Sequence, residues 1–195
     1  MSSEQQQQQS MLDRMRRDFN VAAFVAGGIA VTAEVFLRRR MGSRALGARP
    51  LVGLVALAIF SLLKPRVDPA PLQMFGVAAV AMCFVQSAAS ARRARRGERG
   101  HTRYNGEPWL ALVLPRLSEL TIKRTVEPLV LIGGGVAICH ANELLGIWLI
   151  LAGVAIAMTV RTEEYVERQR LMDLGDAMIE QRYRAERLRS MHGDR

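Results

Sequence analysis

The sequence predicts an all-α, polytopic integral membrane protein with one N-terminal transmembrane helix, two helical hairpins and a cytoplasmic amphipathic helix at the C-terminus. Half of the 195 residues are hydrophobic, and they gather in five blocks separated by charged stretches. None of the 27 Lys and Arg residues lies inside a block. Because one Arg at the centre of a membrane helix costs about 2.5–3.5 kcal/mol, this exclusion favours lipid around the blocks. The predicted membrane segments, about four to five in number, are residues 19–37, 51–63, 71–91, 129–139 and 144–160.

Helices are the expected form of these segments. In lipid, every backbone N–H and C=O group needs a partner within the protein, so only helices and closed barrels span a membrane. The blocks lack the alternating pattern of barrel strands. The soluble alternative is a helical bundle, but its surface helices would show a polar face, whereas these blocks are apolar nearly all round.

The N-terminal part combines a polar segment with the first block. Residues 1–18 are Gln-rich, and we expect them to be disordered or to form a short interfacial helix. The block 19–37 reaches about 28 Å as a helix, close to a hydrocarbon core of about 30 Å. A cleavable secretory signal is the alternative, but cleavage would leave the basic run 38–40 outside the cell.

Two pairs of blocks predict the hairpins. The segments 51–63 and 71–91 are separated by a proline-rich turn, which disfavours a continuous helix. Only residues 140–143 separate the second pair, 129–139 and 144–160. Since 11 residues reach only about 17 Å, the segment 129–139 extends upstream or stays shallow. Whether it and the short 51–63 segment span or re-enter is left open.

Residues 161–195 predict a C-terminal charged helix, with eight Arg and eight acidic residues. Its apolar residues on one face approach heptad spacing, a pattern that favours a helix binding a partner or a second copy. A solvated charged helix is the alternative. The face comprises Leu171, Leu174, Met178, Ala185 and Leu188.

Basic residues predict the orientation. The loops 38–49 and 92–128 carry five and nine of them, and the tail carries eight, whereas the turn 140–143 carries none. Cytoplasmic loops are enriched in Lys and Arg. We therefore expect both loops and the C-terminus on the cytoplasmic side of a bacterial inner membrane, with the side of the N-terminus left open.

Two polar residues inside the blocks are candidates for an intramembrane site. Glu34 is the only charged residue in the five blocks, and such a residue indicates function by default. Arg38 lies four residues later, so a helical ion pair is the simpler expectation, with an ion or proton site as the alternative. Gln86 is expected to hydrogen-bond to another helix.

The basic loops supply the remaining candidates. Tyr104, Asn105, Gly106 and Trp109 are candidates for docking a partner, or, for the aromatic residues, for anchoring at the membrane interface. Juxtamembrane Arg clusters are candidates for anionic lipid headgroups, although topology alone also produces them. These are Arg38, Arg39, Arg40, Arg92, Arg93, Arg95 and Arg96.

No catalytic, cofactor-binding or metal-binding constellation is found in the sequence. The two cysteines lie in apolar blocks and are expected to act as small hydrophobic residues. The expected partners are the bilayer with its anionic headgroups, and other membrane subunits or a second copy; nucleic acid is not expected. The predicted function is a small non-enzymatic membrane subunit that anchors or helps assemble a larger envelope complex, such as a secretion or conjugative-transfer machine. The alternative is a small transporter or channel.

Overall fold

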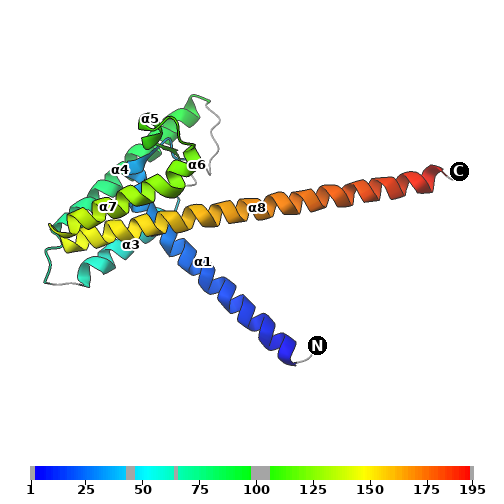
Figure 1. Ribbon diagram of the computed structural model, residues 1–195, viewed down its shortest axis with the longest axis horizontal. Coiled ribbons are helices and arrows are strands. Elements are labelled where there is room, and N and C mark those ends of the chain that lie inside the picture. Colours follow the sequence, from blue (N-terminus) through cyan, green and yellow to red (C-terminus); the bar gives the residue numbers. More distant parts are fainter. Residues whose placement is uncertain (1–2, 43–46, 64–65, 98–105, 194–195) are drawn as a thin grey trace. The chain divides into compact units, whose positions relative to one another are not determined.

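The structure, a computed structural model, describes residues 3–42, 47–63, 66–97 and 106–193. It divides into two compact units, residues 1–159 and 160–195. The chain is mostly helical (Figure 1). In order, its elements are α1 Ser3–Leu37, β1 Arg38–Arg39, α3 Arg49–Leu62, α4 Ala70–Arg95, β2 Glu107–Pro108, α5 Leu110–Val113, α6 Glu119–Thr121, the π-helix η1 Ile122–Val126, α7 Glu127–Cys139 and α8 Glu143–Gly193.

Three helices in the described residues are long and apolar enough to cross a membrane. They are Arg17–Leu37 within α1, Ala70–Arg95 and Glu143–Arg187 within α8. The two short predicted segments correspond to α3 and α7, and neither reaches that length. The helical path of α7, however, continues upstream through η1 and α6 to Glu119, so the end of the predicted loop 92–128 is helical.

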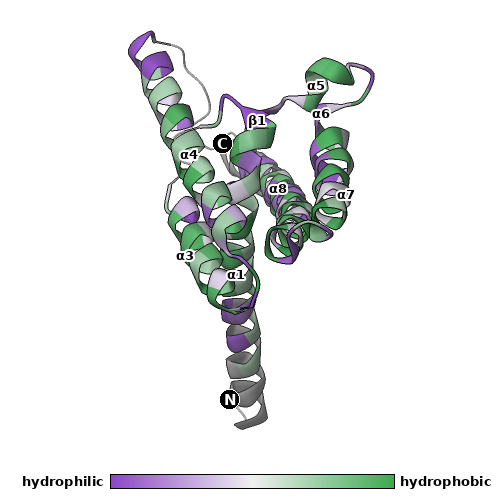
Figure 2. Cartoon of the chain, turned by 90° about the vertical axis from the view of Figure 1, so that its left-hand side faces the viewer, coloured by the Kyte–Doolittle hydropathy of each residue, from purple (hydrophilic) through white to green (hydrophobic). Residues whose placement is uncertain are grey.

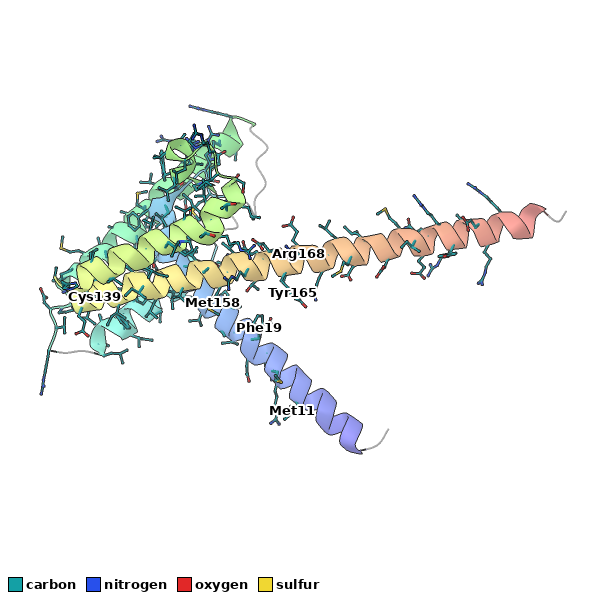
Figure 3. The ribbon with its side chains drawn as sticks, viewed as in Figure 1. Met11, Phe19, Cys139, Met158, Tyr165 and Arg168 are labelled. Carbon is teal, nitrogen blue, oxygen red and sulfur yellow. The ribbon has the colours of Figure 1, made fainter. Side chains whose placement is uncertain are left out.

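Of the two expectations for the N-terminal segment, disorder or a helix, the structure agrees with the helix from Ser3 onward, where α1 begins. Gln, Glu, Met and Arg have high helix propensity, and they make up most of this stretch. The helix is continuous with the first apolar block. Met11 and Phe19 on its N-terminal part are exposed (Figure 3).

Glycines let neighbouring helices of the first unit approach closely. A Cβ on Gly28 of α1 would lie 2.9 Å from the backbone N of Gly53 in α3. In the second hairpin, a Cβ on Gly135 of α7 would lie 2.7 Å from the carbonyl O of Gly146 in α8. These contacts bring backbone against backbone, as small residues do at membrane helix interfaces.

The two hairpin turns lie together. Asn142 Nδ2, in the turn between α7 and α8, donates a hydrogen bond of 3.0 Å to the carbonyl O of Asp68, in the turn before α4. Leu57, Leu72, Leu144 and Trp148 form a buried apolar cluster. The hairpins therefore pack against each other as one body.

A two-stranded pairing, which was not predicted, joins the two basic loops. β1 and β2 pair antiparallel, with Arg38 opposite Pro108 and Arg39 opposite Glu107. Gly106 precedes β2 with a φ of 82°, and a Cβ there would lie 2.7 Å from the carbonyl O of Arg39. A residue with a side chain would be strained by both the conformation and the space.

The second unit is helical from residue 160 to Gly193. Val160 is buried, with 6% of its surface exposed, whereas the large apolar residues from Tyr165 to Tyr183 are exposed, including Tyr165 at 62% (Figure 3) and Leu174 at 60%. The predicted C-terminal helix is present, and the side chain of Leu188 lies outside the described residues.

Candidate functional site

The first unit contains a buried cluster of three charged side chains from two distant segments. Arg38 Nε and Nη2 donate hydrogen bonds of 2.9 and 2.7 Å to Glu127 Oε2. Arg38 Nη1 lies 2.9 Å from Glu34 Oε1. The side chains of Arg38 and Glu127 are fully buried, and that of Glu34 is 5% exposed. The cluster thus joins the end of α1 to the start of α7.

Local structure positions each member. Glu34 and Arg38 are one helical turn apart at the end of α1, the spacing at which a Glu before a basic residue pairs favourably. Glu127 is the first residue of α7, where the helix dipole favours a negative charge. The π-helical turn η1 precedes it directly; such turns are frequent at functional sites.

The charges of the cluster are unequal. With both carboxylates ionised, Glu34 and Glu127 exceed the single guanidinium of Arg38 by one negative charge. Glu127 Oε1 has no hydrogen-bond partner within the described part of the chain. A buried charge without its partner is strongly destabilising, so the three side chains depend on one another.

Other buried polar groups of this unit are also engaged with one another. Gln86 Nε2, in α4, donates a hydrogen bond of 2.8 Å to the carbonyl O of Arg38. Trp148 Nε1, in α8, donates one of 3.2 Å to Thr32 Oγ1 in α1. The intramembrane candidates Glu34 and Gln86 therefore both contact Arg38.

Arg38 itself is the clearest departure from the sequence analysis, which assigned it to lipid headgroups. Its side chain is fully buried and lies between two carboxylates, so it does not reach the surface. Glu127 was not predicted as a site residue because it lies in a loop rich in charge. Its one signal was its position directly before Pro128 and an apolar block.

The next two arginines are partly or largely exposed and share one carboxylate, that of Glu107. Arg39 Nε lies 3.1 Å from Glu107 Oε2, and Arg40 Nη1 lies 3.4 Å from Glu107 Oε1. The guanidinium carbon of Arg39 is 5.6 Å from the centre of the Trp109 ring, a distance at which a cation is attracted to an aromatic face. Gly106 is buried beneath β1, whereas the candidates Tyr104 and Asn105 lie outside the described residues.

The second Arg cluster occupies the end of α4. Arg92, Arg95 and Arg96 are exposed. Arg93 is half-buried, and its Nη2 lies 3.5 Å from the carbonyl O of Met41. The end of α4 therefore lies next to the segment that follows β1.

Metal binding has no support in the described residues, where no group of three or more His, Cys, Asp or Glu side chains could hold an ion. Cys83 and Cys139 are free. Comparison of the chain with protein-family models, curated proteins and solved structures finds no match.

Proposed function

We propose that this chain is a small, non-enzymatic membrane subunit that anchors or helps assemble a larger envelope complex in a bacterial inner membrane. The observation that carries the proposal is a contrast in burial. Inside the first unit, Arg38, Gln86 and Trp148 are hydrogen-bonded to other groups of that unit, which favours a structural role for them. The second unit instead presents exposed apolar side chains on a charged helix.

The packing of the first unit supports the proposal that both basic loops lie on the same side of the membrane. The two hairpin turns contact each other through Asn142 and Asp68. The end of α4 contacts the segment after β1 through Arg93 and Met41. Figure 2 shows α4 as hydrophobic along most of its length and hydrophilic at this Arg-rich end. Under the positive-inside rule, that end is cytoplasmic.

The exposed apolar residues of the C-terminal tail support the proposal that it binds a partner. Leu171, Leu174 and Met178 are 63%, 60% and 61% exposed, and they share one face of the helix. The opposite face is charged, with Glu180 paired to Arg184. A helix with an apolar stripe binds by laying that stripe into a groove or against another helix. We call this stripe, Leu171, Leu174 and Met178, the tail stripe.

The test is purification of the full chain from its native membranes in a mild detergent. The wild-type protein should retain another subunit in stoichiometric amount. The variant Leu174→Gln/Met178→Gln should lose it, because Gln cannot replace the apolar contact. The matched control, Glu180→Gln/Arg187→Gln, changes the charged face without changing the net charge and should retain the subunit. A single pure species from all three proteins would overturn the proposal.

A small transporter is the second candidate, and one observation favours it. Glu127 Oε1 is buried without a hydrogen-bond partner in the described residues, and buried carboxylates in membrane proteins mark ion and proton pathways. Reconstitution of the pure protein in liposomes tests this candidate. Ion or proton flux that Glu127→Gln abolishes would favour it over an assembly role, whereas equal leakage from protein-free liposomes would exclude it.

A further inference from the structure

One segment of the first unit exposes large apolar side chains outside the three candidate spans. Between β2 and η1, the chain exposes Trp109 at 48%, Leu112 at 58%, Val113 at 74%, Leu117 at 41% and Leu120 at 54%. We call these five residues the Trp109–Leu120 surface. With only short helices, α5 and α6, the segment is too short to cross a bilayer.

The backbone holds this surface at the end of a candidate span. The apolar span Arg17–Leu37 ends at Leu37, and the carbonyl O of Leu37 accepts a hydrogen bond of 2.9 Å from the Trp109 N–H. The β1–β2 pairing directly adjoins this bond. Because a span ends where hydrocarbon gives way to headgroups, Trp109 lies at that boundary. Trp is enriched at this depth.

Positive charge borders the surface. Arg39 lies over the Trp109 ring, and Arg39 and Arg40 share a single carboxylate, Glu107. Among the residues that the structure describes, one positive charge is therefore left over at this corner. Arg116, within the segment itself, is exposed. Guanidinium groups bind phosphate oxygens well, so an anionic headgroup complements this border.

We propose that the Trp109–Leu120 surface lies flat in the headgroup region of one leaflet and binds anionic phospholipid. The apolar side chains enter the acyl boundary, and Arg39, Arg40 and Arg116 contact lipid phosphates. Interfacial helices bind membranes through the same combination of apolar area and basic charge. This inference requires the membrane location of the chain, but it does not depend on the tail or on any partner subunit.

The depth of Trp109 can be measured directly, because the chain has only two tryptophans. In the variant Trp148→Phe, Trp109 is the only tryptophan, and the full protein can be placed in vesicles containing brominated phosphatidylcholine. Bromine near the headgroup should quench its fluorescence more than bromine near the chain end. Trp148 is 1% exposed, so the converse variant, Trp109→Phe, should show much weaker quenching at either depth. If Trp148→Phe fails to fold, the difference between wild type and Trp109→Phe gives the same information.

Charge selectivity is the second measurement. Vesicles of phosphatidylcholine with and without phosphatidylglycerol provide the lipid, and native mass spectrometry of the protein in mild detergent counts the lipids retained. Each Arg removed at the border should weaken retention of phosphatidylglycerol about fivefold, as tested by Arg39→Gln and Arg116→Gln. The matched control Arg168→Gln/Arg170→Gln removes two charges from the second unit and should leave retention unchanged.

Two results would overturn the inference. One is Trp109 fluorescence that neither brominated lipid quenches, which would indicate a protein partner or water at this surface. The other is equal phosphatidylglycerol retention by wild type, Arg39→Gln and Arg116→Gln. Loss of the tail-bound subunit leaves both measurements unaffected, so failure of the assembly function and failure of lipid binding can be told apart.

Discussion

The interior of the first unit and the helix of the second unit use the same residue types in opposite ways. In the first, Arg38 lies between Glu34 and Glu127 with no exposed side-chain surface. In the second, Glu180 and Arg184 pair with side chains 64% and 75% exposed. An exposed pair contributes little to stability, about 0–1 kcal/mol, whereas breaking a buried pair costs about 3–5 kcal/mol.

The difference distinguishes the buried contacts that hold the first unit together from the exposed residues of the second unit that are available to a partner. In the first unit, Arg38 lies between two buried carboxylates and glycines bring neighbouring helices into close contact, so these groups are engaged within the chain itself. The second unit leaves its apolar tail stripe exposed, and the proposed partner contact depends on that surface. Four substitutions test this comparison, beginning with the largest expected effect.

Replacing Arg38 should have the largest effect. Arg38→Met removes the guanidinium that both buried carboxylates contact and should lower the free energy of unfolding by about 3–5 kcal/mol. The midpoint of thermal denaturation in detergent measures it. Arg40→Met is the control, because that side chain is 62% exposed. Equal midpoints for the two variants would contradict the buried cluster.

A larger residue at Gly135, in the α7–α8 contact, should have the second-largest effect on stability. In Gly135→Val, the Cβ would overlap the carbonyl O of Gly146, and overpacking costs about 1–3 kcal/mol. Gly134→Val introduces the same residue in the same helix where nothing lies within 4 Å. If Gly134→Val were as unstable as Gly135→Val, the loss of stability would come from helix propensity and not from the close contact. The denaturation midpoint is again the measurement.

Removing the Gln86 hydrogen bond should have a smaller effect. Gln86→Leu deletes the donor to the carbonyl O of Arg38. A hydrogen bond of this kind contributes about 1 kcal/mol to the free energy of unfolding. Gln73→Leu, at an exposed position of α4, serves as the control. Measured by denaturant titration, Gln86→Leu should be less stable than Gln73→Leu, and the reverse order would argue against this bond.

The tail should be the least sensitive. Leu174→Gln changes an exposed residue, and such changes shift stability by less than about 0.5 kcal/mol. The same thermal midpoint should therefore be found for this variant and for wild type. A large drop would mean that the tail stripe is buried in the purified protein, and sedimentation of the wild type would then identify self-association.

The run Arg38–Arg40 shows where prediction from the sequence stopped. All three residues were candidates for lipid headgroups, and only the four-residue spacing from Glu34 distinguished Arg38, as the member of an expected helical ion pair. Successive residues of a strand point to opposite sides, so the β1–β2 pairing turns Arg38 inward and Arg39 outward. That pairing joins segments about seventy residues apart, which no local pattern reveals.

Local chemistry was sufficient for the apolar helices, but not for the β1–β2 pairing. The apolar blocks, the break before α4, the turn between α7 and α8 and the pair formed by Glu34 and Arg38 all depend on neighbouring residues, and the sequence by itself determined them. Tertiary structure alone decided that Glu127 completes the ion cluster, that Gly135 meets Gly146 and that Trp109 bonds to Leu37. Each of these contacts requires distant segments to meet, and the energy that selects them comes from burial, which exists only once the chain has packed.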